Sequence, residues 1–320
     1  RKERAREMDS PSPKRKLQPS NDVDPPEWTE LVLPWLTHRE LAAVAGTCKS
    51  LYRTSQSITR RRSLDASRSL EPHPIPFSNP NPNIPHPKPY HFFLYAPSQF
   101  LPPSPPRQPW GGPRLPTRSP VGESSECACD AGGGGLLEEA AGIVMECGPG
   151  CRVTRSGMGV RLKVVWDGRK GWGLVADRDI PRRQFVCEYA GELLTTKEAR
   201  SRQKIYDDLS SSGKFYSALL VVREHLPSGK ACLRVNIDAT YIGNIARFIN
   251  HSCDGGNLST VLVRTAGSLL PRLCFFAAKD IREGEELTFS YGEIRVRSNK
   301  GLPCYCGSSC CYGTLPSEST

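Results

Sequence analysis

The sequence predicts a mostly β fold for the C-terminal half of the chain, behind an N-terminal region that is partly helical and partly extended. Three observations lead to this prediction: short β-rich runs from Val160 onward, a dense series of prolines before them, and clustered cysteines. At 320 residues the chain is long enough for one large or two small domains. No run of about 18 apolar residues occurs, which excludes a membrane-spanning helix.

Residues 1–24 are interpreted as a disordered basic tail. The chain has a net charge of +10, and residues 1–120 hold 18 Lys and Arg against 10 Asp and Glu. The cluster Lys14-Arg15-Lys16 is typical of a nuclear-import signal, of a nucleic-acid patch or of a solvated tail, so direct DNA contact stays open. The chain begins at Arg1 and no signal peptide is visible, although a truncated start would hide one.

Residues 25–70 are expected to form a small helical segment. Apolar residues recur at roughly helical spacing, interrupted near Pro34, at Leu33, Leu36, Leu41, Val44, Cys48 and Leu51. Together with the run Cys48-Lys49-Ser50-Leu51-Tyr52, this pattern resembles an F-box, a helical module that recruits ubiquitin-ligase partners. The resemblance implies a ubiquitin-ligase or other protein partner here, and a generic helical hairpin is the alternative.

Residues 71–120 are interpreted as a proline-rich linker. They contain 17 prolines in 50 residues, including the run Pro102-Pro103-Ser104-Pro105-Pro106. Each proline removes a backbone donor and restricts the residue before it, so a packed element is not expected. The stretch is either a ligand for proline-recognising domains or a plain spacer.

Residues 158–294 have the pattern of a compact domain of short strands separated by Gly, Pro, Asp and Ser. The predicted strands are Val160–Trp166, Gln184–Tyr189, Ala218–Arg223, Cys232–Ile237, Thr260–Arg264, Leu273–Ala277 and Glu286–Tyr291. One helix is predicted over Lys197–Leu209, because Thr195 and Glu198 form a capping box at its start. Its core-facing residues are expected to be Ala199, Ile205, Tyr206 and Leu209.

The cysteines are odd in number, at 13, and no secretory signal accompanies them, which argues against a disulfide framework. Eight of them fall in two groups: Cys127, Cys129, Cys147 and Cys151, then Cys304, Cys306, Cys310 and Cys311. Thiolates this close in sequence can converge on one ion, and zinc is the usual occupant of an all-sulfur site.

Four segments carry the functional signal. They are Lys170-Gly171-Trp172-Gly173-Leu174, Glu188-Tyr189-Ala190-Gly191-Glu192, Arg247-Phe248-Ile249-Asn250-His251-Ser252-Cys253 and Glu286-Leu287-Thr288-Phe289-Ser290-Tyr291-Gly292. Each alone has an ordinary structural interpretation, but coincidence does not account for all of them in this order. From about Val160 to Leu315 the chain resembles the SET-domain protein-lysine methyltransferases. Its flanking cysteines are similar to those of the suppressor-of-variegation branch, including plant members, which methylate histone H3, commonly at lysine nine.

The resemblance implies a site for methyl transfer from S-adenosylmethionine to a lysine amine. This in-line displacement depends on positioning and charge placement rather than on a covalent nucleophile. The implied cofactor-binding residues are Lys170, Gly171, Trp172, Gly173, Arg247, Asn250, His251 and Tyr291. Tyr291 is the implied catalytic tyrosine, Tyr189 a wall of the lysine channel, and Phe289 the position where a phenylalanine leaves room for products beyond monomethyl-lysine.

The resemblance also implies a pseudoknot and two cysteine-rich flanks. The family threads its Asn-His segment beneath the C-terminal strand, which would bring Tyr291 beside Asn250 and His251. In the post-SET segment, 295–320, the trio Cys304, Cys306 and Cys311 would join Cys253 around a structural zinc ion. The pre-SET segment, 121–157, departs from the family. The family has nine cysteines around three zinc ions, whereas Cys127, Cys129, Cys147 and Cys151 would suffice for one ion, or mark a damaged segment.

These features predict a nuclear chromatin enzyme that methylates histone H3 on nucleosomes, with lysine nine as the expected target and gene silencing as its role. One alternative is a non-catalytic adaptor that combines an F-box-like module with a SET fold. Another keeps the chemistry and changes the substrate to a non-histone protein.

Overall fold

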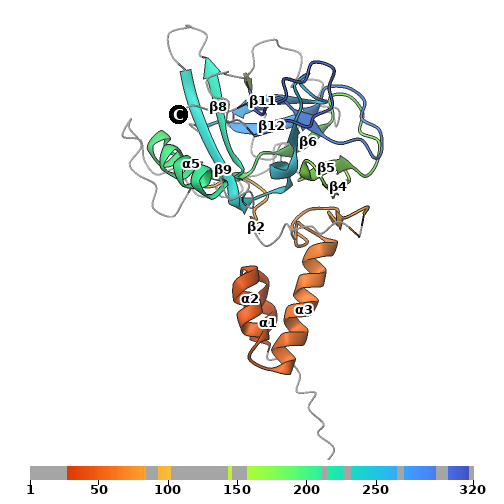
Figure 1. Cartoon of the computed structure of the whole chain (residues 1–320), viewed down its shortest axis with the longest axis vertical. Helices are drawn as coiled ribbons and strands as arrows, with labels where there is room; N and C mark the ends of the chain where they lie inside the picture. Colours follow the sequence, from red (N-terminus) through yellow and green to blue (C-terminus); the bar gives the residue numbers. More distant parts are fainter. Residues whose placement is uncertain are drawn as a thin grey trace, which may run out of the picture.

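The computed structural model describes residues 27–81, 83, 93–101, 143–145, 157–210, 215, 217–225, 232–264, 270–292 and 302–316. The predicted basic tail and the predicted zinc ligands Cys127, Cys129, Cys147 and Cys151 lie outside these residues. Figure 1 shows the N-terminal helices at one end of the molecule and a group of small sheets at the other. Among the described residues, the helices are all too short or too polar to cross a membrane.

The N-terminal helices are α1 (Trp28–Val32), the 3₁₀ turn η1 (Leu33–Trp35), α2 (His38–Ala45) and α3 (Lys49–Leu64). We call residues 27–64 the helical module. Helix α2 begins with a capping box in which the Thr37 side chain accepts from the Glu40 backbone and Glu40 accepts from the Thr37 backbone. The helices share a small core of Leu33, Leu41 and Ile58. The helical segment expected from the apolar spacing is therefore present.

Residues 71–81 and 93–101 pair with strands of the main domain, which corrects the linker predicted over 71–120 for these described residues. Strand β1 (Phe77–Ser78) pairs in parallel with β4 (Leu162–Asp167), and β2 (Leu94–Tyr95) pairs in parallel with β9 (Cys232–Gly243). Ile75 lies buried in the main core between two prolines. Proline lacks a donor but keeps its acceptor, and the Pro76 carbonyl accepts from the Val164 backbone at 2.9 Å. Residues 102–120 lie outside the described part.

The remaining structure is mostly β, as predicted, in four small sheets. Their orders are β1-β4-β5, β3-β11-β12-β6, β2-β9-β7 with β8 beside β9, and β10-β13. The strands not yet introduced are β3 (Ile143–Met145), β5 (Gly171–Ala176), β6 (Phe185–Glu188), β7 (Gly191–Leu194), β8 (Leu219–His225), β10 (Asn250–His251), β11 (Leu258–Arg264), β12 (Arg272–Ala277) and β13 (Thr288–Phe289). Each of the seven predicted ranges contains or overlaps an observed strand, whereas β5 and β7, which begin at glycines, were not predicted.

The Asn-His segment and the C-terminal strand meet, as the pseudoknot prediction requires. Strand β10 pairs in parallel with β13, with Asn250 opposite Thr288 and His251 opposite Phe289. Gly256 permits the close approach, because its φ is +78° and a Cβ there would lie 2.2 Å from the Thr288 carbonyl oxygen. The pairing places residues of the short 3₁₀ turn η4 (Ile245–Phe248) and of β10 next to the segment that ends at Tyr291.

Helix α5 (Thr196–Ser210) begins at the predicted capping residue, since the Thr195 hydroxyl accepts from the Glu198 backbone at 3.2 Å. Ala199 and Tyr206 are buried as predicted, but Ile205 and Leu209 are 53% and 42% exposed, which corrects the predicted core face. A polar cluster holds the helix instead. The buried Asp238 carboxylate accepts from the Tyr206 hydroxyl at 2.7 Å and from Arg202 at 2.8 Å, and Arg202 also pairs with Glu192 at 2.6 Å.

Replacing Arg202 by leucine is expected to lower the free energy of unfolding by about 2–3 kcal/mol, because Asp238 would remain buried without its cation. The matched control is Arg200→Leu on an exposed position of the same helix. Denaturant unfolding of both variants measures the difference. Equal losses in the two variants would contradict the assignment of this cluster as the anchor of α5.

Candidate active site

Aromatic rings from four segments form a continuous row. Ring centroids lie 6.3 Å apart for Tyr189 and Phe275, 4.8 Å for Phe275 and Phe289, 5.0 Å for Phe289 and Tyr291, and 5.3 Å for Tyr291 and His251. The row brings together Tyr189, Phe289 and Tyr291, the three residues predicted to be catalytic. Phe275 also belongs to the row, although it was not among the predicted site residues. Sequence reasoning missed it because every residue of β12 is buried, so nothing in the pattern separates a site residue from the core.

Tyr291 is fixed at both its backbone and its hydroxyl. Its backbone N–H donates to His251 Nδ1 at 3.1 Å, and its hydroxyl donates to the Ile249 carbonyl at 2.7 Å. Burial, reinforced by the negative charge of Glu286, raises the pKa of the Tyr291 phenol, which therefore stays neutral at neutral pH. A phenol that gives its proton to a carbonyl keeps its oxygen lone pairs for an incoming donor such as an amine.

Tyr189 follows the end of β6, with 5% of its surface exposed. Its hydroxyl donates to the Ala218 carbonyl at 2.8 Å, which fixes the ring at the far end of the aromatic row. Burial, together with the neighbouring Tyr291, raises the pKa of the Tyr189 phenol. Both phenols are thus neutral and pack against apolar aromatic rings, a setting that suits the aliphatic stem of a lysine.

Glu286 connects two of the predicted cofactor segments. Its carboxylate accepts from Asn250 Nδ2 at 2.8 Å and forms an ion pair with Lys170. Gly173 makes room for this arrangement, because a Cβ there would lie 2.7 Å from Glu286 Oε1 and 3.1 Å from Asn250 Nδ2. Sequence reasoning missed Glu286 because it stands next to Glu285 at the start of a motif, and the sequence does not distinguish these two acids.

Trp172 and Arg247 are held by aromatic neighbours. The Trp172 ring lies 5.2 Å from Trp166, edge to face. The Arg247 guanidinium carbon lies 4.6 Å from the ring centre of Phe93 and 5.2 Å from that of Phe248. Desolvation, opposed by the negative charge of Asp238, lowers the pKa of Arg247 to about 10, so Arg247 remains a cation at neutral pH.

The Arg247 side chain has two buried donors, Nε and Nη1, without a hydrogen-bond partner among the described residues. Buried donors in native proteins are almost always satisfied, and a desolvated cation is best satisfied by an anion. The carboxylate of a bound amino-acid cofactor such as S-adenosylmethionine fits this requirement.

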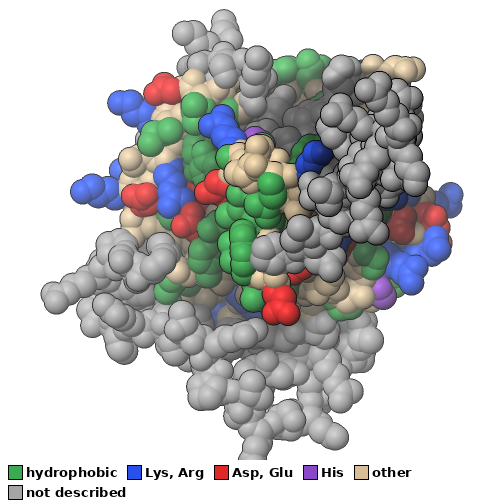
Figure 2. All heavy atoms as spheres, turned by 90° about the horizontal axis from the view of Figure 1, so that it is seen from below, with side chains coloured by type: hydrophobic (Ala, Val, Ile, Leu, Met, Phe, Trp, Pro, Cys, Tyr) green, Lys and Arg blue, Asp and Glu red, His purple; other side chains and the backbone are tan. Residues whose placement is uncertain are grey.

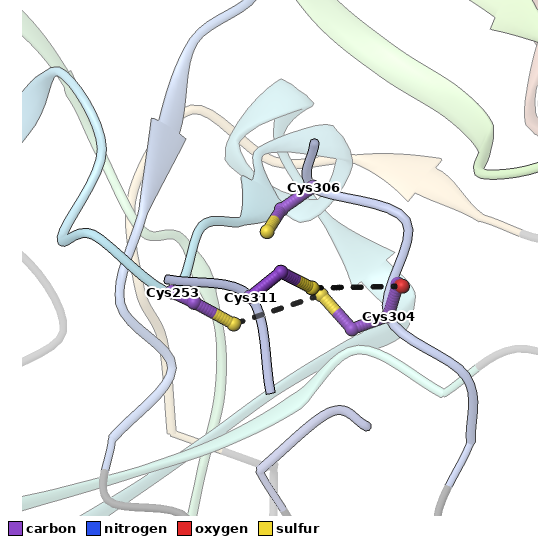
Figure 3. Close-up of side chains that lie close together, drawn as sticks. All are labelled: Cys253, Cys304, Cys306 and Cys311. Carbon is purple, nitrogen blue, oxygen red and sulfur yellow. Dashed lines mark hydrogen bonds between the residues drawn. The ribbon is translucent and has the colours of Figure 1, made fainter. Parts of the chain in front are cut away.

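Four cysteine sulfurs converge on one point, as Figure 3 shows. The Sγ atoms of Cys253, Cys304, Cys306 and Cys311 all lie within 4.8 Å of one another, and those of Cys253 and Cys304 are 3.8 Å apart. In a tetrahedron with zinc–sulfur bonds of about 2.3 Å, sulfurs are about 3.8 Å apart. These four residues therefore fit the predicted zinc ion, whereas Cys310 is exposed and outside the group.

The protonation of these thiols is uneven. Burial raises the pKa of Cys304 to about 12. Burial also opposes ionisation of Cys306, but hydrogen bonds, first among them one with Ser308, outweigh it and lower the pKa of Cys306 to about 5. A thiolate already formed at neutral pH is a ready first ligand for a metal ion, and metal binding would displace the remaining protons.

His251 links the cysteine cluster to Tyr291. Its Nδ1 accepts from the Tyr291 backbone, so its Nε2 carries the proton and lies 3.3 Å from Cys253 Sγ. A hydrogen bond of this kind to a metal ligand, here Cys253, fixes the orientation of that ligand. One imidazole thus spans the predicted zinc site and the backbone of the predicted catalytic tyrosine.

Comparisons with known proteins agree with this geometry. The SET domain family matches residues 171–292. The sequence is 52% identical to histone-lysine N-methyltransferase SUVR3 of Arabidopsis thaliana, over 98% of this chain and 99% of that protein. The crystal structure of Arabidopsis thaliana SUVH6 in complex with SAM aligns with a TM-score of 0.58 and 26% identity, over 79% of this chain and 55% of that one.

Two further comparisons concern the substrate. SUVH6 carries the description H3 lysine-9 specific, and its sequence is 32% identical over 62% of this chain and 30% of its own length. The structure of KRYPTONITE in complex with mCHH DNA, H3(1-15) peptide and SAH aligns with a TM-score of 0.54 and 27% identity, over 79% of this chain and 53% of that one.

Fold and site together define a protein-lysine methyltransferase that depends on S-adenosylmethionine. The chain belongs to the SET-domain histone-lysine N-methyltransferases, in the suppressor-of-variegation class that its motifs indicated.

Proposed function

We propose that this enzyme methylates lysine nine of histone H3 in nuclear chromatin. The observation that carries the proposal is the aromatic row that contains Tyr291, whose hydroxyl is fixed by its hydrogen bond to the Ile249 carbonyl. The described relatives support the substrate: SUVH6 is named H3 lysine-9 specific, and KRYPTONITE was crystallised with an H3(1-15) peptide. A nuclear location follows from a chromatin substrate.

The cofactor would lie against the segment from Lys170 to Gly173 and against Arg247, Asn250, His251 and Tyr291. Arg247 would satisfy its orphan donors on the cofactor carboxylate, and Trp172 would offer an apolar face. When bound, S-adenosylmethionine supplies an activated methyl group for in-line attack by the lysine nitrogen. Glu286 holds Asn250 and Lys170 together, so it fixes the shape of this pocket before binding.

The lysine would enter along Tyr189, Phe275 and Phe289. These walls exclude water from the aliphatic stem, and their faces stabilise the methylated ammonium by cation–π attraction. The Tyr291 oxygen accepts an amine N–H, which turns the nitrogen lone pair toward the methyl carbon. Near-attack positioning of this kind is the main source of rate in a displacement without a covalent intermediate.

The structural zinc ion would be held by Cys253, Cys304, Cys306 and Cys311. Three of these ligands belong to residues 302–316 and the fourth, Cys253, follows β10, so the metal would fasten the C-terminal segment beside the site. Through His251 the same ligand set would fix the backbone of Tyr291.

Phe289→Tyr is expected to shift the product toward monomethyl-lysine. Phe289 is 3% exposed and 5.0 Å from Tyr291 between ring centres, so an added hydroxyl would crowd the amine and hold a water molecule there. Mass spectrometry of an H3 peptide at matched turnover reads the product distribution. Phe215→Tyr, beside α5, serves as the control. An unchanged distribution in Phe289→Tyr would contradict this role.

The lysine target is tested with H3(1–15) peptides in which each lysine in turn is replaced by arginine. We expect methylation of all peptides except the one that lacks lysine nine. Methylation that survives this replacement and disappears with another would assign a different H3 lysine. Activity confined to non-histone substrates, with folded enzyme and bound S-adenosylmethionine, would overturn the histone proposal.

A second proposal concerns the helical module, for which we infer a protein partner in a ubiquitin ligase. Four apolar side chains of α1 and η1 are strongly exposed: Trp28, Leu31, Val32 and Trp35. Figure 2 views this end of the molecule and shows hydrophobic side chains gathered at its centre. Contiguous exposed apolar surface of this kind usually marks a protein interaction site.

This surface is tested by pull-down with a purified ubiquitin-ligase adaptor that binds F-boxes. Trp35→Asp is expected to abolish capture, because Trp35 is 60% exposed and its loss does not open the core. Tyr52→Asp is the control. Tyr52 is similarly exposed, but it lies near the start of α3, whereas α3 contacts α1 near its other end, where Arg61 pairs with Glu30. If the adaptor captured neither the native chain nor Tyr52→Asp, the proposal would be overturned.

A further inference from the structure

Aromatic side chains from residues 71–101 pack directly against the proposed cofactor residues. The Phe77 ring lies 5.6 Å from Trp172 and 6.0 Å from Phe248, both edge to face. The Phe93 ring lies 5.6 Å from Phe248, in the same manner, and 4.6 Å from the Arg247 guanidinium. A segment outside the matched SET region thus contacts two of the proposed cofactor residues, Trp172 and Arg247.

The contact between Phe93 and Arg247 has a particular electrostatic consequence. Phe93 is 4% exposed, so its ring replaces water over the guanidinium. The negative face of an aromatic ring stabilises a desolvated cation without using any of its N–H donors. Arg247 therefore keeps its charge while Nε and Nη1 stay available to a ligand.

The backbone explains how two distant phenylalanines reach these positions. Strand β1 pairs Phe77 with Val164 of β4, and β4 pairs in turn with β5, which carries Trp172. Strand β2 pairs Leu94, next to Phe93, with Ile242 of β9, whose chain continues into η4 and Arg247. Each short strand thus delivers one aromatic ring to one cofactor segment.

We propose that Phe77 and Phe93 are positioning residues for S-adenosylmethionine binding: Phe77 sets the orientation of Trp172, and Phe93 holds the Arg247 cation in place to meet the cofactor carboxylate. The proposal rests on the assignment of Trp172 and Arg247 to the cofactor. It also places the start of the functional unit before Phe77, rather than at the pre-SET segment.

The test measures S-adenosylmethionine affinity of the full chain by isothermal titration, without any histone. Phe93→Leu is expected to raise Kd about tenfold, and Phe77→Leu by a smaller factor. In the methyl-transfer assay the Phe93→Leu effect should fall on the KM for the cofactor, with kcat largely retained. Replacing Phe93 with trifluorophenylalanine keeps the shape of the ring but weakens its negative face, and is expected to raise Kd by about threefold.

Tyr95→Leu is the matched control. Tyr95 lies on β2, just after Phe93 in the sequence, with 5% exposure, and its hydroxyl is bound to Glu71 rather than directed at the pocket. We expect it to lower the melting temperature and leave cofactor affinity unchanged. Native affinity in folded Phe93→Leu, or an equal loss of affinity in Tyr95→Leu, would overturn the proposal. If the chain bound the cofactor but did not methylate H3, only the histone assignment would be refuted.

Discussion

Tyr291→Phe is expected to reduce methyl transfer by about 10²–10⁴-fold while the enzyme still binds S-adenosylmethionine. The substitution removes one oxygen, which donates to the Ile249 carbonyl and is placed to receive the amine. The ring contacts with Phe289 and His251 persist, so the fold should not change. Single-turnover transfer to an H3 peptide measures the chemical step, and isothermal titration measures cofactor affinity.

Tyr241→Phe controls for the general loss of a phenol. Tyr241 lies on β9 with 48% of its surface exposed, away from the aromatic row. It should retain native rates. If Tyr291→Phe retained more than about a tenth of native single-turnover activity, the phenol would not be the group that orients the amine.

Cys304→Ser is expected to remove the zinc ion and, with it, nearly all activity. Cys304 is the most buried of the four ligands, and its sulfur lies 3.8 Å from that of Cys253. Without the metal, residues 302–316 lose the attachment that it provides through Cys253, and the His251 contact to Cys253 loses its fixed partner. Metal content by mass spectrometry and proteolysis of the C-terminal segment give readouts that do not depend on activity.

Cys310→Ser is the control, because Cys310 belongs to the same segment but is exposed and outside the cluster. It should keep the zinc ion and the activity. If Cys304→Ser and Cys310→Ser lost equal amounts of metal, or if Cys304→Ser kept its metal, the four-cysteine site would be wrong.

Sequence motifs located much of the candidate site because its groups sit in short, distinctive runs. Tyr189, Phe289 and Tyr291 fall in one aromatic row, and Cys253 joins the three C-terminal cysteines although it is 51 residues away from Cys304. The strands were found for a similar reason, since alternation and turn residues are local signals. The roles of these residues in binding and catalysis stay predictions.

The missed parts depend on partners that are distant in sequence. Strands β1 and β2 have two residues each, and nothing in a proline-rich stretch shows that β4 and β9 will pair with them. Phe275 is hidden in a wholly buried strand, and Glu286 acquires its role only through contact with Asn250 and Lys170. Ile205 failed as a core prediction because buried Asp238, rather than an apolar face, anchors α5.

The most direct test combines the full chain, zinc, labelled S-adenosylmethionine and recombinant nucleosomes, in parallel with Tyr291→Phe. The full chain is needed because Phe77 and Phe93 lie before the cysteine-rich segments. We expect label on histone H3 that disappears when lysine nine of H3 is replaced by arginine and when Tyr291 is replaced. Label on H3 that persists in Tyr291→Phe, or no label from an enzyme that binds both zinc and cofactor, would contradict a Tyr291-centred H3 methyltransferase.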